Sequence, residues 1–341
     1  MENQCFVSII VPIYNSSPFL EQTLLALQAQ TMERLEIILI DDGSTDDSPS
    51  ICKKFVQADP RFFYYRKENA GVSAARNDGI RHAKGQWLMF CDSDDLPFPQ
   101  MAQRLFEKAM DTNADCVLCD FQIQTERDTV SDRLEMPHDL EKPDDILEHL
   151  ILPMCVWGYG EKSVYGSVWR GLYRTERLHL DGEPLQFPEG ICFGEDLLFN
   201  IQVWRACRRI SFVPEILYTY VDNTNSAVHT NYSLRWERSK LLWQRASELL
   251  QAVDLTEEQR RWHSFQLTRY AVDSILFGVC TAECPSYQKW RLTAKILSAS
   301  ELKAARCQIP HSLSLKDKVL LFFLKPIFAP IVTRYYQGTI K

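Results

Sequence analysis

The sequence predicts an α/β fold, in which a doubly wound and mostly parallel sheet is followed by a helical region at the carboxyl end. Three observations support this fold class. Over residues 6–91, apolar runs of strand length alternate with amphipathic segments of helical length. Acidic and polar residues stand directly after these runs, where sheets of this kind bind ligands. From residue 233 onward, Leu, Trp and Tyr recur at helical spacing among charged residues.

The first part of the chain has the pattern of repeated βαβ units. Four apolar runs are predicted to be buried strands, at residues 6–11, 35–40, 61–66 and 86–91. The segments between them carry apolar side chains at helical spacing, at residues 18–30, 46–58 and 71–83. Each such helix supplies the crossover that two parallel strands require. The four strands are therefore expected to form one parallel sheet.

The pattern loosens after residue 120. Cys116 and Cys119 lie in an apolar run that is expected to be a buried strand with reduced thiols. Residues 125–145 are polar and charged, and they are predicted to form a surface excursion or lid. Ordered elements are expected to resume with a periodic stretch at 146–152, a helix at 195–206 and strands at 210–213 and 216–220.

The amino-acid composition limits which cellular compartment and which kinds of binding partner are expected. The 341 residues are 45% hydrophobic, enough to fill the core of a catalytic domain with a helical addition. A net charge of −7 argues against nucleic-acid binding, because affinity for phosphate backbones needs a basic face. The 11 cysteines are scattered without paired metal-type spacing, which favours reducing cytoplasm. Neither a signal peptide nor a run of membrane-spanning length is expected.

Three carboxylates follow the fourth predicted strand, in the motif DSDD at residues 92–95. They would repel one another unless a cation offsets their charge. Mg²⁺ or Mn²⁺ prefers oxygen ligands, leaves positions for phosphate and neutralises a diphosphate leaving group. Capping of a following helix, ahead of Pro97 and Pro99, is the alternative role for these acids.

Polar residues also follow the other strands. The motif DDGSTD at residues 41–46 combines acids that can accept from a base or ribose with a glycine that permits close backbone approach; its Ser44 or Asp46 can also cap a helix. Tyr14 offers an aromatic face to a nucleobase, or packs at the rim of the core. In the motif NAGVSAARN at residues 69–77, Arg76 can meet phosphate oxygens or form a surface ion pair.

These motifs, together with VSIIVPIYN at residues 7–15, resemble the family-2 glycosyltransferases, which are inverting enzymes of the A-type glycosyltransferase fold, a Rossmann-like α/β architecture. The resemblance is dense over residues 6–105. It continues more thinly through VWRGLYR at 168–174, FPEG at 187–190 and GEDLLF at 194–199, and it fades beyond residue 228.

The resemblance implies roles for individual residues. Tyr14 and Asp42 match positions that contact the nucleobase, which in this family is commonly uracil. Asp94 matches the principal metal ligand, which implies Mn²⁺ or Mg²⁺ as cofactor. The implied donor-binding set is Pro12, Tyr14, Asp42, Asn69, Arg76, Asp92 and Ser93.

The pair Glu195-Asp196 resembles the acidic pair of the family, with Asp196 as the general base that deprotonates the acceptor hydroxyl. Without the resemblance, these acids would be assigned to a helix start favoured by the helix dipole. Val221 departs from the family, because many members carry an Arg there near the diphosphate; His229 or Arg235 are candidate replacements. The further candidate contacts to the diphosphate or acceptor are Glu195, Asp95, Trp169 and His229.

The activity implied by the resemblance is inverting transfer of a sugar from a UDP-sugar donor to a saccharide or lipid-linked acceptor in cell-surface polysaccharide synthesis. The expected catalytic domain spans residues 1–230, with the nucleotide sugar at 1–120 and the acceptor side at 121–230, followed by a helical region at 231–341. A nucleotidyltransferase is one alternative, but residues 12–17 lack its usual Gly-rich, basic loop. A catalytically idle nucleotide-binding scaffold is the other, against which the intact Asp92, Asp94 and Asp196 argue.

Residues 316–341 combine a dense apolar stretch with basic residues and two prolines. The stretch is too short and too broken to span a bilayer. It can lie in the interface of an anionic membrane, which suits a lipid-linked acceptor and places the protein on the inner face of the plasma membrane. It can equally dock on the protein itself or form a homo-oligomer contact. Both interpretations stay open at this point.

Overall fold

A computed structural model of the protein describes residues 6–136, 138–156, 159, 164–180, 183–191, 193–222, 234–282, 284–313 and 324–339. The chain divides into two compact units. The sheet unit comprises Met1–Ile151 and Val164–Asn223, and the helical unit comprises Leu152–Ser163 and Thr224–Lys341. None of the helices in the described ranges combines the length and the apolar character needed to cross a membrane.

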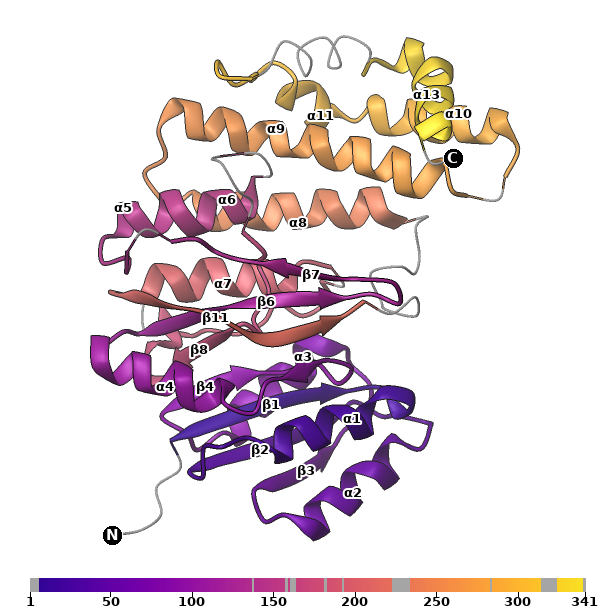
Figure 1. The fold of residues 1–341 in the computed structure, drawn as a ribbon. Coiled ribbons are helices and arrows are strands. Elements are labelled where there is room, and N and C mark those ends of the chain that lie inside the picture. The colour runs from indigo at the N-terminus through magenta and orange to yellow at the C-terminus, as the bar shows by residue number, and fades with distance from the viewer. Residues whose placement is uncertain are drawn as a thin grey trace. The chain divides into compact units, whose positions relative to one another are not determined.

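The sheet unit contains a nine-stranded sheet within the described residues (Figure 1). Its order is β3-β2-β1-β4-β8-β6-β11-β5, and β7 pairs with β6 outside this path. The strands are β1 (Val7–Ile13), β2 (Leu35–Asp41), β3 (Phe62–Arg66), β4 (Trp87–Phe90), β5 (Leu96–Pro97), β6 (Cys116–Gln124), β7 (Thr129–Asp132), β8 (Gly171–Arg174) and β11 (Ile210–Val221). A separate antiparallel pair joins β9 (His179–Leu180) and β10 (Glu183–Pro184).

The amino-terminal half of the sheet has the predicted parallel arrangement. β1 pairs in parallel with β2 and β4, and β2 pairs in parallel with β3. The crossovers α1 (Ser17–Gln28), α2 (Ser48–Ala58) and α3 (Val72–His82) match the predicted helices. Both α1 and α2 carry a proline in the first turn, where its fixed φ suits the helix and its missing N–H costs no hydrogen bond.

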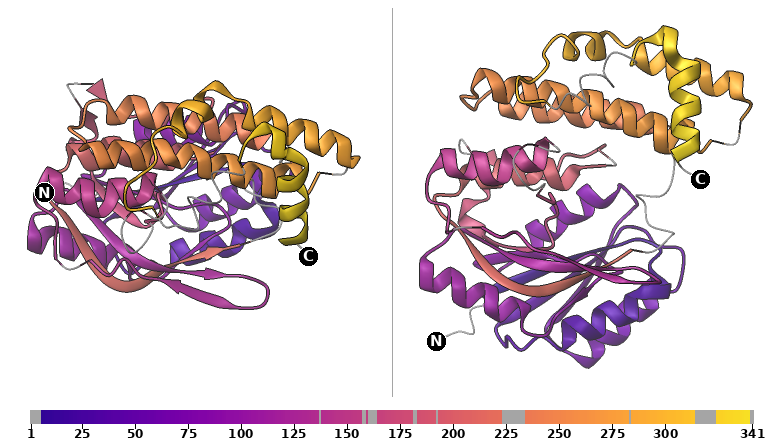
Figure 2. Two further views of the ribbon diagram at one scale, coloured as in Figure 1. Left: turned by 90° about the horizontal axis from the view of Figure 1, so that it is seen from above. Right: turned by 45° about the horizontal axis from the view of Figure 1, so that its top comes forward.

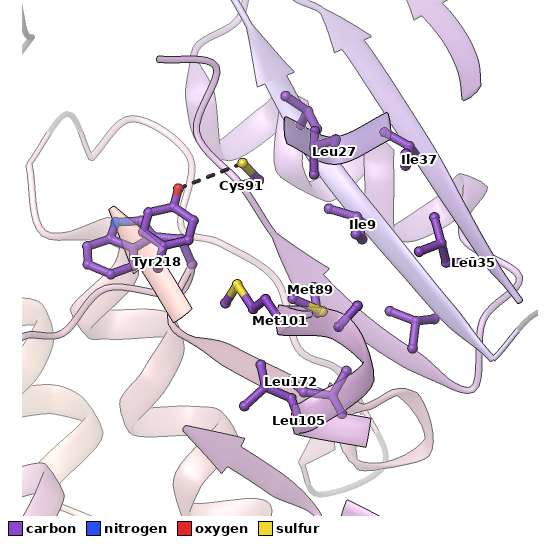
Figure 3. Close-up of a cluster of buried hydrophobic side chains, with 14 of the residues drawn as sticks. Ile9, Leu27, Leu35, Ile37, Met89, Cys91, Met101, Leu105, Leu172 and Tyr218 are labelled. Carbon is purple, nitrogen blue, oxygen red and sulfur yellow. Dashed lines mark hydrogen bonds between the residues drawn. The ribbon is translucent and has the colours of Figure 1, made fainter. Parts of the chain in front are cut away.

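One face of this sheet packs on the main hydrophobic core (Figure 3). Ile9 of β1 and Ile37 of β2 lie with Leu27 of α1 and with Leu105 of α4 (Met101–Thr112) in this buried cluster. The alternation of side chains along each strand sends every second residue to this face. The core therefore holds α1 and α4 against the strands whose ends form the site.

Helix α3 packs on β1 and β2 through the opposite set of side chains. Ile38, Ile40 and Ala75 form a small cluster there. Gly79 lets the helix approach closely, because a Cβ at this position would lie 2.2 Å from Cγ2 of Ile10. With both faces covered by helices, the fold class predicted from the sequence is confirmed.

The carboxyl-terminal half of the sheet is mixed rather than parallel. β8 lies between β4 and β6 and is antiparallel to both, although the sequence pattern predicts no strand there, since four residues are too few to show a period. β11 unites the strands predicted at 210–213 and 216–220, and a register shift between Val213 and Ile216 accommodates Pro214. The predicted surface excursion contains β7, an exposed strand paired with β6.

Shorter elements connect the sheet to α7 (Glu195–Ala206). In the sheet unit they are α5 (Pro143–Ile146), the π-helical turn η1 (Leu147–Ile151) and the 3₁₀ turn η2 (Thr175–Arg177), whereas α6 (Leu152–Cys155) belongs to the helical unit. The helical unit, visible in Figures 1 and 2, contains α8 (Arg235–Leu250), α9 (Glu257–Ser274), η5 (Ile275–Val279), α10 (Ser286–Leu297), α11 (Ser300–Ala305), η6 (Pro326–Phe328) and α13 (Ala329–Thr339). A capping box of Thr256 and Gln259 begins α9. This confirms the helical region predicted after residue 233.

Candidate active site

The loops after β1 and β2 are tied together at the carboxyl edge of the sheet. Asn15, with a left-handed φ of 51°, accepts from the N–H of Thr45 at 2.8 Å through its amide oxygen, and its own N–H donates to Oγ of Ser44 at 3.0 Å. The N–H of Ser17 donates to Oδ2 of Asp46 at 2.9 Å. Burial of Asp46 is outweighed by hydrogen bonds of this kind, which lower its pKa to about 2. These bonds fix the platform beside Tyr14.

Asp42, the predicted nucleobase contact, is almost fully buried. Its carboxylate accepts from the backbone N–H groups of Ala70 and Gly71 at 3.0 and 2.7 Å and from Nζ of Lys67 at 2.9 Å. Asp42 thereby ties the loop after β2 to the start of α3. Its contact with a base stays a prediction, and its carboxylate also supports the loop.

Gly43 brings the same two loops into close contact. Its φ is +79°, and a Cβ at this position would lie 3.0 Å from the backbone N of Asn69. A larger residue would therefore be strained in conformation and crowded against the neighbouring loop. Asn69 and Tyr14 are the exposed members of the predicted donor-binding set.

The acidic loop lies directly after β4 and is anchored through Asp95. The Tyr218 hydroxyl donates to Oδ2 of Asp95 at 2.8 Å, and the Val221 N–H donates to its Oδ1 at 2.9 Å. Burial, followed by the charges of Asp92 and Asp94, raises the pKa of Asp95 well above its usual range. Asp95 is fully buried, whereas Asp92 and Asp94 each keep part of their surface exposed. Within this loop, Asp95 therefore serves as an anchor, and Asp92 and Asp94 are the acids that solvent or a ligand can reach.

Arg76 is the buried cation of the site. Its Nη2 donates to Oδ1 of Asp92 at 2.8 Å, and its Nη1 donates to Oδ1 of Asp196 at 2.6 Å and to Oε1 of Glu195 at 3.0 Å. Although burial opposes its charge, Asp196, Asp92 and Glu195 raise the pKa of Arg76 above its usual value. Of the two roles that the sequence left open, the surface ion pair is excluded, because the side chain is only 3% exposed.

Asp196 lies in the first turn of α7 and has a second partner in the Val168 N–H, which donates to its Oδ2 at 3.2 Å. Burial is the main reason that the pKa of Asp196 is raised to about 7; Arg76 works against this, and Glu195 and Asp92 add to it. The side chain retains 19% exposure. A carboxylate with a near-neutral pKa and an accessible edge can accept a proton from a hydroxyl.

The segment before α7 is fixed to α3 by residues that the sequence did not mark as functional. The side-chain amide of Asn77 donates to the Phe187 carbonyl at 3.0 Å and accepts from the Phe187 N–H at 2.8 Å. The Phe187 ring stacks on Phe199 of α7 with a centroid distance of 4.0 Å. Both Asn77 and Phe187 stand inside the motifs that carry the resemblance, and that was the available signal. Their contacts bring the acids of α7 to Arg76.

The remaining predicted residues have varied environments. Pro12 is buried within β1, and the Ser93 hydroxyl lies 2.6 Å from the Ser16 hydroxyl, joining the loops after β4 and β1. Trp169 is buried in the main core, where it stacks on Tyr218 at a centroid distance of 4.4 Å. His229 lies outside the described residues. The sequence did not single out Tyr218, because an aromatic residue in a strand usually signals packing alone.

The charges of the site suit a hard divalent cation. Arg76 faces three carboxylates and offsets one, and Asp94 adds another acid nearby in the loop. Over the described ranges, no group of three or more His, Cys, Asp or Glu side chains could hold a metal ion by itself. Mg²⁺ is commonly held by one or two carboxylates together with substrate phosphates. The residues present therefore fit an ion that shares its ligands with a bound diphosphate.

Comparison with known proteins places this geometry in context. The family model for glycosyl transferase family 2 matches residues 8–192. The chain is 37% identical over 230 residues to the uncharacterized glycosyltransferase EpsJ of Bacillus subtilis (strain 168). That match covers 66% of this chain and 64% of EpsJ, so it spans less than two thirds of that relative.

Two solved structures resemble the fold. S. aureus TarS 1–349 in complex with UDP-GlcNAc has a TM-score of 0.69 and 19% identity, covering 98% of this chain and 91% of that chain. Mannosyltransferase PcManGT from Pyrobaculum calidifontis in complex with GDP-Man and Mn²⁺ has a TM-score of 0.52 and 16% identity, covering 96% and 87%. At these identities the likeness concerns the fold, which is the A-type glycosyltransferase fold.

Proposed function

The chain belongs to glycosyl transferase family 2, and from that premise we propose that it transfers a sugar from a UDP-sugar to a saccharide or lipid-linked acceptor, with inversion, in cell-surface polysaccharide synthesis. Glycosyltransferase activity follows from the family. The donor, the acceptor and the stereochemistry are the proposed part. The observation that carries the proposal is the guanidinium of Arg76, which bonds both Asp92 of the acidic loop and Asp196 of α7.

Asp196 is the proposed general base. As the acceptor oxygen bonds to the anomeric carbon of the sugar, the bond from that carbon to the diphosphate oxygen breaks, and UDP leaves with the bonding electrons. The acceptor proton passes to the Asp196 carboxylate. Inversion requires this carboxylate on the face of the sugar opposite the leaving group. Support comes from its raised pKa of about 7 and from the bonds of Arg76 and Val168, which orient its two oxygens.

The proposed donor pocket uses the carboxyl ends of β1, β2 and β4. The exposed ring of Tyr14 would stack on uracil, and Asn69 and Asp42 would border the base. Asp92 and Ser93 would contact the ribose and diphosphate. Uridine is favoured because the TarS structure of the same fold holds UDP-GlcNAc. Residues 1–120 would thus bind the nucleotide sugar and 121–230 the acceptor, with Glu195 and His229 as further candidate contacts. Asp95 and Trp169, which the sequence also suggested as contacts, are buried and bonded or stacked within the protein, so they are not proposed to touch the ligand.

We also propose Mn²⁺ or Mg²⁺ as the cofactor, with Asp94 as the principal ligand. When bound, the ion would supply positive charge that stabilises the departing diphosphate. Two observations support it: the surplus of carboxylates over cations around Arg76, and the Mn²⁺ in the PcManGT complex, which has a similar fold.

The proposed place of action is the cytoplasm, with peripheral contact at the inner face of the plasma membrane through the carboxyl-terminal region. A lipid-linked acceptor would be presented at that surface. A homo-oligomer contact through the same region is the alternative use of those residues.

A screen of nucleotide sugars tests the donor. We expect a UDP-sugar, in the presence of Mn²⁺, to raise the melting temperature and to be slowly hydrolysed to UDP, because water can replace the acceptor. Stabilisation and hydrolysis should both be absent with GDP-mannose. Stabilisation by GDP-mannose alone would overturn the assignment of uridine, and hydrolysis undiminished in Asp196→Asn would overturn the assignment of the base.

A further inference from the structure

The last part of the helical unit has a charge opposite to that of the rest of the chain. Residues 285–341 contain ten Lys or Arg residues and two acids, Glu301 and Asp317, which gives a net charge of +8. The whole chain carries −7, so residues 1–284 carry −15. Such an asymmetry between parts of a chain indicates an acidic partner for the basic part.

Apolar side chains form an exposed row along η6 and α13. Ile327, Ile331 and Tyr335 are spaced four residues apart and are 78%, 58% and 64% exposed. The other side of α13 packs against α10 and η5. There Val332 and Thr333 are buried, and the Thr333 hydroxyl lies 2.8 Å from that of Thr293 in α10. The row therefore lies on the side of α13 away from these contacts.

Cationic side chains accompany the row. Arg334 is exposed between Ile331 and Tyr335, and on α10 Arg291 and Lys295 are exposed. Neither helix contains an Asp or Glu residue. Helix α10 also exposes large apolar side chains, Tyr287, Trp290 and Leu292. Apolar and basic groups are thus mixed on two helices that pack together (Figure 2), and neither helix supplies an acid of its own.

We infer that the exposed sides of α10 and α13 form a docking surface for an anionic phospholipid bilayer. The apolar row enters the boundary between headgroups and acyl chains, and the Lys and Arg side chains bond the lipid phosphates. This inference deepens the proposed function. The biological role of the docking surface rests on that function, because the enzyme would meet a lipid-linked acceptor at the membrane.

Two other partners fit the surface less well. A second copy of the chain, docked through the same face by a twofold axis, would bring Arg291, Lys295 and Arg334 toward their like-charged equivalents, which costs free energy. A nucleic acid would meet the cations but gain nothing from Ile327 and Ile331, because phosphate contacts are ionic. An anionic bilayer uses both kinds of side chain.

Sedimentation of the full-length protein with vesicles tests the inference. We expect binding to vesicles of phosphatidylcholine with phosphatidylglycerol and little binding to phosphatidylcholine alone. The double variant Ile327→Ser/Ile331→Ser should bind at least about tenfold more weakly, because two aliphatic side chains no longer leave water. In the variant Arg291→Glu/Arg334→Glu, each substitution should lower the affinity for anionic vesicles by about fivefold or more. Raised salt should likewise weaken the binding of the wild-type protein to these vesicles.

Matched control variants distinguish this surface from general effects of charge or hydrophobicity. Lys53→Glu/Lys54→Glu makes the same change of charge at exposed positions of α2, and Leu25→Ser/Met110→Ser removes exposed apolar side chains of α1 and α4. Both controls should bind vesicles as the wild type does. Equal losses in controls and test variants would overturn the inference.

Two further outcomes would also overturn it: a wild-type protein that binds neither kind of vesicle, or a stable dimer that Ile327→Ser/Ile331→Ser dissociates without any vesicle binding. The proposed function fails in a different way. UDP release without vesicles should be equal in wild type and docking variants. Its absence in all of them, with vesicle binding intact, would contradict the donor proposal and leave the docking surface standing.

Discussion

Nη1 of Arg76 lies 2.6 Å from Oδ1 of Asp196, although 120 positions separate the two residues in the chain. Nη2 of the same guanidinium lies 2.8 Å from Oδ1 of Asp92. One buried cation therefore joins the loop after β4, where the diphosphate is proposed to bind, to the start of α7, where the base is proposed. Together with the bonds between Asn77 and Phe187, this guanidinium sets the distance between the acidic loop and Asp196.

Replacing Asp196 by Asn should abolish transfer while preserving donor binding. The amide keeps the size of the side chain but cannot take the acceptor proton, so kcat should fall by about 100-fold or more. UDP release with acceptor gives the rate, and the thermal shift with UDP-sugar gives binding. Glu195→Gln is the matched control, since Glu195 shares the Arg76 contact, and we expect a smaller loss. An Asp196→Asn enzyme within about tenfold of the wild type would contradict the assigned role.

The pH profile of kcat/KM should show an acidic limb with its midpoint near the Asp196 pKa of about 7. Only the ionised carboxylate accepts a proton. Below the midpoint Asp196 is protonated and the rate is low, and as the pH rises through the midpoint the rate climbs to a plateau. An aspartate at its ordinary pKa of 3.8 would instead give a flat profile around neutrality. Such a flat profile would show that burial does not set the protonation of this group.

Removal of divalent cations should stop turnover, and Mn²⁺ or Mg²⁺ should restore it. A second readout is the melting temperature with UDP, which Mn²⁺ should raise further because diphosphate and Asp94 share the ion. Asp94→Asn should lose this additional stabilisation. Asp111→Asn, at an exposed position of α4, is the control for removing an acid. Full turnover in excess EDTA would refute metal dependence.

Replacing Gly79 by Ala should destabilise the sheet unit by about 1–3 kcal/mol through overpacking. The new Cβ would lie 2.2 Å from Cγ2 of Ile10, so α3 must shift away from β1. Because α3 carries Arg76, activity should fall as well. Urea unfolding of the single variants and of Ile10→Ala/Gly79→Ala measures the coupling, and the double variant should be more stable than additivity predicts. Strict additivity would mean that this contact does not position α3.

The parts of the fold that local pattern specifies were predicted well. Apolar runs and helical spacing predict the strands and helices from β1 to β4. The acids after these strands predict the edge of the sheet at which a ligand binds. β8 was not predicted, because its four residues carry no period and its antiparallel place between β4 and β6 is a long-range pairing. β7 could not be recognised from the sequence, because its mostly polar and exposed residues suit an exposed edge strand as well as a loop.

The candidate site shows the same division. Asp92, Asp196 and Arg76 could be named from the sequence, since carboxylates and guanidinium groups beside strand and helix ends are chemically conspicuous. Their mutual bonds could not, nor could the fixing of the segment before α7 by Asn77 and Phe187. The difference in role between Asp92 and its neighbour Asp95 depends on the Tyr218 hydroxyl, a partner 123 positions away.

The sequence by itself determined the class of fold, the edge at which chemistry occurs and the kinds of group available there. Each of these depends on residue type and spacing within a short stretch. The tertiary structure alone decided that one acid anchors a loop, that another lies beside a buried cation with its pKa raised by burial to about 7, and that Trp169 packs in the core. Burial and charge pairing arise where distant segments meet, and no local pattern specifies which segments those are.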